Sequence, residues 1–203
     1  MTKVDFKRER KELYRPSTKE VSLVEVPAMN FLMIDGEGDP GKGGEFELAI
    51  EALYPLAYSL KFMSKQSESG QDYVVPPMEG LWWADDMSAF LEQRRDEWKW
   101  TLMIMQPDFI RDEMVESAFE TVRKKKRPEF LDRVRFESFD EGTSVQIMHI
   151  GPYSEEGPNI QRLHAKIDEL GKTHNHKHHE IYLSDPRRAA PEKLKTVLRQ
   201  SYC

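Results

Sequence analysis

The sequence predicts an α+β protein of two tandem strand-helix-strand-strand modules, with antiparallel sheets and the helices on one side. Three observations favour this class: short segments with period-two apolar alternation, apolar residues at helical spacing between them, and a second half that repeats the element order of the first. The two halves share the order of their expected elements and the placing of their turn residues, but their residues are not identical. Two such units would lay their sheets side by side, and clefts between similar lobes often take ligands.

Module one is expected at about residues 19–107, after an N-terminal arm at 1–18. The arm mixes both charge signs with few apolar residues, which predicts a frayed helix or extended segment. The module's expected elements are a β-hairpin, an amphipathic helix that Pro55 should kink, and two further strands, at residues 21–34, 46–63, 81–83 and 98–105.

A linking helix is expected at about residues 108–127, and module two at about 133–203. The linking helix ends in four basic residues, which complement the dipole of a helix C-terminus. Module two repeats the plan with a hairpin of two strands, a helix capped by Gly171 and two final strands, at residues 134–138, 143–150, 160–170, 179–185 and 195–199.

Charge and cysteine content exclude several classes of protein. The 203 residues hold 30 Lys and Arg against 36 Asp and Glu, so the net charge is −6. An acidic surface argues against direct binding to nucleic acid or an anionic membrane. Cys203 is the only cysteine, which rules out a disulfide framework, a cysteine zinc site and a buried thiol nucleophile. Charged residues at the start and no apolar run of spanning length lead us to expect a cytoplasmic protein.

Two segments invite a ligand interpretation that the sequence does not favour. Four histidines at 174, 176, 178 and 179 are of a type that binds metal ions, but the interpretation we favour is a solvated loop with no metal site. The glycine-rich loop at 36–44 lacks the GxxxxGKS/T motif of phosphate loops. Its Glu37 and Asp39 would repel phosphate, so a flexible turn is expected, and no cofactor.

Glu180 is the strongest candidate for a reactive group. It lies in an otherwise apolar strand, where alternation puts Glu180 and Tyr182 on one face and Ile181 and Leu183 in the core. The first pair would project a carboxylate and a phenol into the expected cleft, although an exposed strand face fits the pattern equally well. A carboxylate among aromatic rings is desolvated, which primes it as a base and also attracts cations.

Aromatic residues at strand ends are candidates for the walls of that cleft. Aligning Asp85 with Asp185 sets Trp82 opposite Tyr182 and sends Trp83 to the core, and a slip of one residue would exchange the two indoles. Aromatic walls suit flat or cationic molecules. The expected ligand-binding residues are Glu79, Trp82, Tyr73, Trp100 and Tyr153.

Five blocks of the sequence resemble a known family, the stand-alone GyrI-like small-molecule-binding proteins. Together the blocks span about residues 19–199, and they occur in the family's order. They are VPAMNFLMIDGEGDP at 26–40, PMEGLWW at 77–83, MIMQPD at 103–108, QIMHIGPY at 146–153 and HHEIYLSDP at 178–186.

The resemblance implies pseudo-twofold symmetry between the modules and a ligand cleft between them. Some stand-alone members are cyclopropanoid cyclopropyl hydrolases, which destroy DNA-alkylating natural products of the yatakemycin type and so protect against xenobiotics. Glu180 falls on the family's pocket glutamate, and Tyr182, Trp82 and Tyr153 fall on family aromatic positions. We therefore expect a binder of flat aromatic or cationic molecules that, if it is an enzyme, opens activated cyclopropane rings with Glu180 as general base. Tyr182 or Trp82 would donate to the developing phenolate.

Two alternatives from other classes remain at this point. One is a non-catalytic protein that sequesters or senses multiple drugs. The other is an inhibitor that binds DNA gyrase, as some members of the family are described, and we rank it last.

Overall fold

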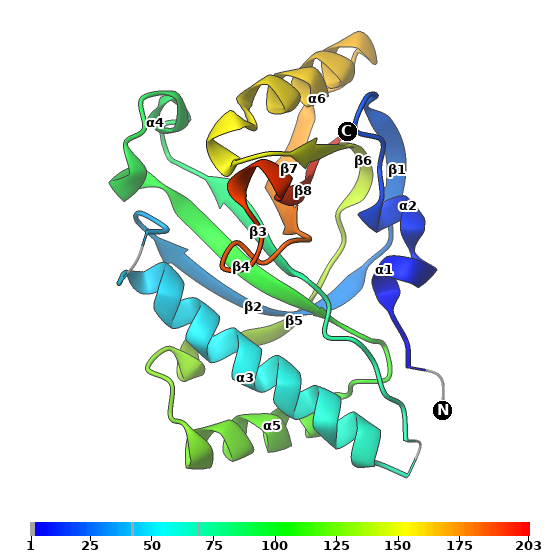
Figure 1. Ribbon diagram of the computed structural model, residues 1–203, viewed down its shortest axis with the longest axis vertical. Helices are drawn as coiled ribbons and strands as arrows, with labels where there is room; N and C mark the ends of the chain where they lie inside the picture. The colour runs from blue at the N-terminus through cyan, green and yellow to red at the C-terminus, as the bar shows by residue number, and fades with distance from the viewer. Residues whose placement is uncertain (1–2, 42, 69) are drawn as a thin grey trace. The chain divides into compact units, whose positions relative to one another are not determined.

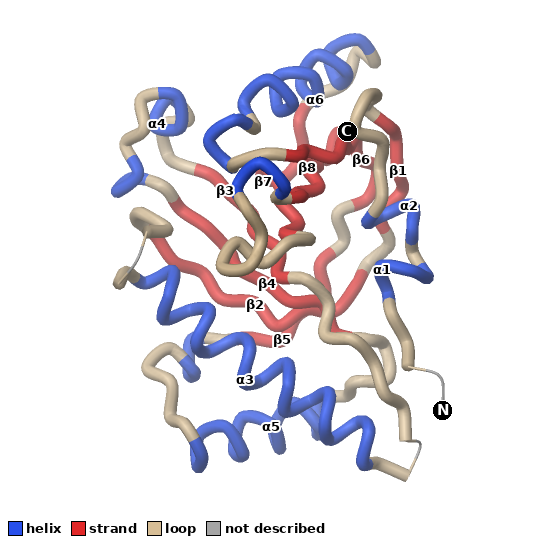
Figure 2. Tube along the Cα trace, viewed as in Figure 1, coloured by secondary structure: helices blue, strands red, loops and turns tan. Residues whose placement is uncertain are grey.

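The computed structural model describes residues 3–41, 43–68 and 70–203, which form eight β-strands and six α-helices (Figures 1 and 2). Two segments predicted from the sequence extend beyond the described residues: the arm begins with residues 1–2, and the glycine-rich loop contains Lys42. The ladders within each half of the structure are antiparallel, which confirms the α+β class. Contacts divide the chain into unit 1 (Met1–Phe6, Met29–Pro76 and Trp82–Phe139) and unit 2 (Lys7–Ala28, Pro77–Leu81 and Asp140–Cys203).

Unit 1 is built around β2 (Met29–Glu37). This strand pairs with β4 (Lys99–Gln106) on one side and with β5 (Arg135–Phe139) on the other. Helix α3 (Glu45–Gln66) packs on β2 and β4, and α5 (Asp112–Lys125) runs beside α3 (Figure 1). Leu53, Ala57 and Leu60, which belong to the helical spacing read from the sequence, are fully buried, and so are Ala49, Ala52 and Leu56.

Unit 2 contains the strands β1 (Ser22–Val26), β6 (Gly142–Ile150), β8 (Lys195–Tyr202) and β7 (His174–Tyr182), in that spatial order. Helix α6 (Gly157–Glu169) covers one face and contacts β6 and β8. Leu163 and Ile167 of α6 form a core with Val145, Ile147 and Leu198 of the strands.

Both hairpins expected from the sequence are wrong, although all four of their strands are present. Ser22 of β1 pairs with Gln146 of β6, and Phe31 of β2 pairs with Glu137 of β5. Strand β1 therefore belongs to unit 2, although β2, the next strand in the chain, belongs to unit 1. Likewise β5 belongs to unit 1, although the next strand, β6, belongs to unit 2. Alternation identifies which face of a strand is buried but not which strand lies beside it, and neither connection carries a strong two-residue hairpin signal. Strand β3 (Met78–Trp83) belongs partly to each unit.

The N-terminal arm contains two short helices, α1 (Phe6–Glu9) and α2 (Lys11–Tyr14). Leu13 and Tyr14 are buried and anchor it. The remaining short elements are α4 (Ser88–Leu91) and four 3-10 turns, η1 (Arg95–Glu97), η2 (Leu131–Arg133), η3 (Tyr153–Glu155) and η4 (Pro191–Lys193). Within the described ranges, no helix is long and apolar enough to cross a bilayer.

The histidine tract is a strand and not the solvated loop that we expected. His174 to His179 form the first part of β7, with a register irregularity between Asn175 and His179 and a positive φ of 56° at His176. A strand of polar residues shows no apolar alternation, so its pattern resembles that of a loop. The segment nevertheless pairs with β8 at both of its ends, with His174 opposite Tyr202 and His179 opposite Arg199.

Candidate functional site

The strand register decides which residues of unit 2 share a face. Ile147, Leu198 and Glu180 are direct cross-strand neighbours on β6, β8 and β7, and Ile147 and Leu198 pack beneath α6. Glu180 therefore stands on the face that α6 covers. Ile181, one residue along, is fully buried, as the alternation predicted.

Glu180 and Tyr182 are joined by a hydrogen bond. The Tyr182 hydroxyl donates to Oε2 of Glu180 at 2.8 Å. The Tyr153 ring meets the Tyr182 ring edge-on at a centroid distance of 5.7 Å, and 40% of Tyr153 is exposed. Burial, followed by nearby carboxylates, raises the pKa of Tyr153 to about 12. The structure thus brings three of the expected site residues together in unit 2, and their catalytic and binding roles stay predictions.

Glu156 adds a second carboxyl group that sequence reasoning missed. It is the N-cap residue of α6, is only 4% exposed, and lies beside Glu180 and Thr196. Burial, and then the charge of Glu180, raise the pKa of Glu156 to about 10. The two carboxyl groups therefore retain one proton at neutral pH. Within the described chain, Oε1 of Glu156 has no hydrogen-bond partner.

His178 completes this group, which we call the Glu156–Glu180 site: Tyr153, Glu156, His178, Glu180 and Tyr182. Nε2 of His178 lies 3.6 Å from Oε1 of Glu180, close enough for an ion pair when the ring is protonated. Neither of its buried ring nitrogens makes a hydrogen bond to a described residue. A carboxylate, a phenol and a protonated carboxyl group in one partly dry site form an acid–base arrangement.

The opposite face of the sheet carries a buried cluster of charges. His179 lies between two carboxylates, with Nδ1 3.0 Å from both oxygens of Glu141 and Nε2 2.9 Å from Oε2 of Glu79. Arg199 donates to Glu141 at 3.1 Å and to the backbone carbonyl of Leu13 at 2.8 Å. The cluster therefore also fastens the N-terminal arm.

Charge pairing in this cluster outweighs burial. Burial alone would lower the pKa of His179, but Glu141 and Glu79 raise it to about 9. Burial alone would raise the pKa of Glu141, but His179 and Arg199 lower it to about 2. At neutral pH His179 is a cation that donates from both nitrogens. Since the carboxylate of Glu79 already accepts from His179, its expected role in ligand binding stays a prediction.

In unit 1, Trp82 and Trp100 both contact the ring of Phe46. Phe46 stacks on Trp82 at a centroid distance of 5.9 Å and meets Trp100 edge-on at 5.3 Å. Trp82 also meets Trp98 edge-on at 6.0 Å. Trp100 lies across Gly36, its cross-strand partner, so closely that a Cβ on Gly36 would lie 2.1 Å from the indole. Trp82 is 7% exposed and Trp100 is fully buried, so both rings belong largely to the core of unit 1.

Tyr73, also in unit 1, contacts Gln106 and Phe109. It is fully buried, its hydroxyl donates to Oε1 of Gln106 at 3.2 Å, and its ring meets Phe109 edge-on at 5.7 Å. Burial raises the pKa of Tyr73 well above its usual value. Its position is that of a packed and hydrogen-bonded core residue, and its expected role in ligand binding stays a prediction, as does the cleft between the modules.

The described residues offer no group of three or more His, Cys, Asp or Glu side chains that could hold a metal ion. A signal for the missed Glu156 was nevertheless present in the sequence. Gly157 and Pro158 follow it directly, and proline favours the first turn of a helix, which makes Glu156 a residue at a helix start. Its position only three residues after Tyr153 links it to the expected aromatic residues.

Comparison with known proteins supplies the family. The model of the GyrI-like small molecule binding domain matches residues 19–199. A solved structure described as an uncharacterized conserved protein from Listeria innocua is 45% identical, with a TM-score of 0.90 over 99% of this chain and 100% of that chain. Another, described as a hydrolase from Listeria innocua, is 44% identical, with a TM-score of 0.88 over 100% of both chains.

More distant similarity extends to the fold alone. The EcmrR C-terminal domain is 12% identical, with a TM-score of 0.58 over 91% of this chain and 97% of that chain. No curated protein matches the sequence. Because the family match covers nearly the whole of the sequence, the chain belongs to the GyrI-like small-molecule-binding domain family.

Proposed function

We propose that the protein binds flat aromatic compounds and hydrolyses those that carry an activated cyclopropane ring, as DNA-alkylating natural products of the yatakemycin type do. The observation that carries the proposal is the hydrogen bond from Tyr182 to Glu180, beside the protonated Glu156. The description of a 44% identical relative as a hydrolase supports hydrolysis over binding alone. The half-exposed ring of Tyr153 supplies an aromatic surface at the same place.

The reaction adds one water molecule to the strained ring. Glu180 takes a proton from the water, whose oxygen forms a bond to a cyclopropane carbon. The carbon–carbon bond of the ring breaks, and its electron pair moves through the conjugated dienone to the carbonyl oxygen. Tyr182 donates its proton to that oxygen and regains one from Glu180 through their 2.8 Å hydrogen bond. Protons and electrons balance without an oxidant or a reductant.

Glu156 has a positioning role in this scheme. With its pKa raised to about 10, it stays neutral at physiological pH, so it adds no second negative charge beside Glu180. A neutral carboxyl group beside Glu180 can donate a hydrogen bond to it without competing for the proton of the water.

The test is turnover of a cyclopropanoid alkylator, followed by mass spectrometry of the ring-opened product. Glu180→Gln should lower kcat at least about a hundredfold, the usual contribution of a general base. Glu155→Gln is the matched control, because Glu155 is an exposed carboxylate next to Glu156. Unchanged turnover in Glu180→Gln would remove the assigned base.

The same assay separates the hydrolase from a sequestering protein. A sequestering protein would quench the tryptophan fluorescence saturably and return the compound intact, and Glu180→Gln would then change affinity rather than product formation. Recovery of unaltered compound after prolonged incubation with saturating wild-type protein would contradict the proposed hydrolysis.

A further inference from the structure

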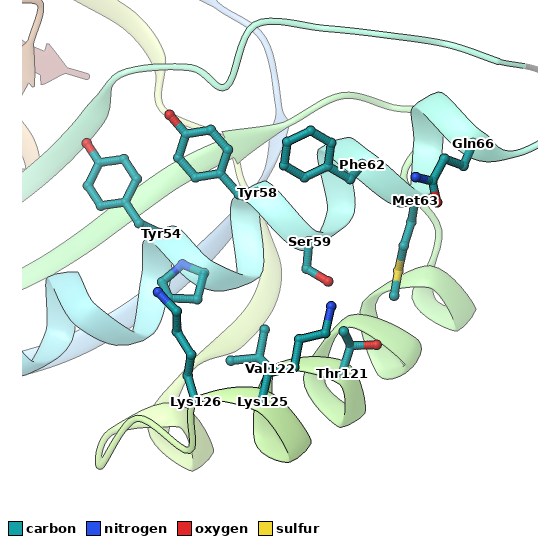
Figure 3. Close-up of a pocket in the computed structure, with 11 residues that line it drawn as sticks. Tyr54, Tyr58, Ser59, Phe62, Met63, Gln66, Thr121, Val122, Lys125 and Lys126 are labelled. Atoms are coloured by element: carbon teal, nitrogen blue, oxygen red, sulfur yellow. The ribbon is translucent and has the colours of Figure 1, made fainter.

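A pocket of about 680 Å³ lies between α3 and α5 in unit 1 (Figure 3), and no residue of the Glu156–Glu180 site lines it. From α3, the residues that line it include Tyr54, Tyr58 and Phe62. Its α5 side carries the ammonium groups of Lys125 and Lys126. The proposed function uses none of these residues.

The three rings form a ladder along α3. They recur every four residues, which places them on one side of the helix. Successive ring centroids are 6.3 and 6.4 Å apart, and both pairs are inclined by 29°. Tyr58 is 47% exposed and Phe62 is 52% exposed. Neighbouring aromatic rings left this exposed are typical of a surface that binds something.

The far end of the ladder is held in place from within the protein. Nζ of Lys61 lies 5.1 Å from the centroid of the Phe62 ring, and the same ammonium group pairs with Asp72 at 2.5 Å. Lys61 is itself buried. Because Phe62 rests against a fixed cation, its exposed surface is already positioned for a stacking partner, which lowers the entropy cost of binding.

Charge decides what kind of aromatic compound fits. Lys125 and Lys126 are exposed at the C-terminal end of α5, and the described residues that line the pocket include no Asp or Glu. A cationic compound would gain from the ring faces but would be repelled by two ammonium groups. An anionic compound gains from both the rings and the charges.

We propose that this pocket is a second ligand site, which takes a planar aromatic compound carrying a carboxylate or sulfonate group. The ring stacks on the ladder formed by Tyr54, Tyr58 and Phe62, while the anionic group lies against Lys125 and Lys126. Exposed ion pairs contribute little affinity, so stacking supplies most of the binding and the lysines supply the selectivity.

Titration with naphthalene-2-carboxylate tests the site, read by NMR of protein labelled with ¹³C at the methionine methyl groups. Met63 lines the pocket, whereas Met148 lies in unit 2 and serves as an internal control. The Met63 signal should shift saturably and the Met148 signal should not. The neutral naphthalene-2-carboxamide should bind about two- to fivefold more weakly, and 2-naphthylmethylammonium more weakly still.

Variants separate stacking from charge. Phe62→Ala should weaken binding about tenfold, as loss of an aromatic contact does. Lys125→Gln combined with Lys126→Gln should abolish the preference for carboxylate over carboxamide while leaving carboxamide affinity unchanged. Lys124→Gln is the matched control, because Lys124 pairs with Glu120 and does not line the pocket. Glu180→Gln should bind the probe like wild type, so failure of the proposed hydrolysis leaves this test intact.

Three results would overturn the proposal. One is equal affinity for the three naphthalene probes. Another is a Met63 shift that depends on protein concentration without probe, which would assign the ladder to a contact between two copies of the chain. The third is tighter binding of oligothymidylate than of the carboxylate, which would assign it to single-stranded nucleic acid. Should Phe62→Ala not fold, the double lysine variant decides alone, since both lysines are exposed.

Discussion

Replacing His179 with Asn removes the cation that separates two buried carboxylates, Glu79 and Glu141. The pKa of His179 is raised from 6.5 to about 9, a shift that corresponds to about 3 kcal/mol of folding free energy. Removing one partner of a buried ion pair costs about 3–5 kcal/mol, which agrees with this figure. We therefore expect His179→Asn to lower the free energy of unfolding near pH 6 by several kcal/mol.

The pH dependence gives the sharper readout. A raised histidine pKa means that its stabilisation is complete below pH 6.5 and is lost as the pH rises through about 9. Glu141 acts in the opposite direction, because its pKa is lowered from 4.5 to about 2 and its stabilisation is lost as the pH falls through that range. Together they give the cluster its greatest stability between about pH 4.5 and 6.5. The His179→Asn protein should instead become more stable as the pH falls from 6.5 to 4.5, because proton uptake relieves the repulsion between the two facing carboxylates.

Urea unfolding at several pH values between 4 and 9 measures both effects. His176→Asn is the matched control: His176 is exposed in the same strand, and asparagine tolerates its positive φ. Other groups titrate in the same range, so the informative quantity is the difference between each variant and wild type. If His179→Asn keeps the wild-type slope between pH 6.5 and 9, or costs no more than His176→Asn, the pairing argument is refuted.

Three further changes have defined outcomes. Gly36→Ala should destabilise by about 1–3 kcal/mol or more in urea unfolding, because the new Cβ would lie 2.1 Å from the buried indole of Trp100; Gly157→Ala, with open space around it, should be near neutral. Glu156→Gln should remove a loss of stability that wild type shows as the pH rises from 4.5 towards about 10, and should therefore unfold at higher urea than wild type near pH 9. The same variant should keep wild-type turnover at pH 7, since an amide replaces a neutral carboxyl group, and a loss as large as that of Glu180→Gln would contradict the positioning role.

Local patterns predicted the elements well, because apolar spacing reports directly on which face is buried. The helical face of α3 and the burial of Ile181 follow from spacing alone. The hydrogen bond between Glu180 and Tyr182 follows from the same alternation, which puts side chains two residues apart on one face.

These local patterns could not predict which strands pair or which charged residues are buried. Nothing local to residues 22–26 records that they pair with residues 142–146, since that choice depends on the whole packed unit. His179 looks like part of a polar loop because its burial depends on Glu79 and Glu141, which lie 100 and 38 residues away in the chain. The pKa of Glu156 is likewise raised first by burial and then by the charge of Glu180, which comes later in the chain.

The exchange of β1 and β5 has a consequence for fragments and for folding. Neither unit is a continuous stretch of chain, so no single cut releases either one whole. A fragment starting at residue 29 would lack β1 and expose the edge of β6, and an exposed strand edge promotes aggregation. Pairing Ser22 with Gln146 also closes a loop of well over half the chain, and such contacts of high sequence separation slow folding. The two units should consequently fold together. A nascent chain should stay sensitive to proteases until its last strands have been synthesised and can pair.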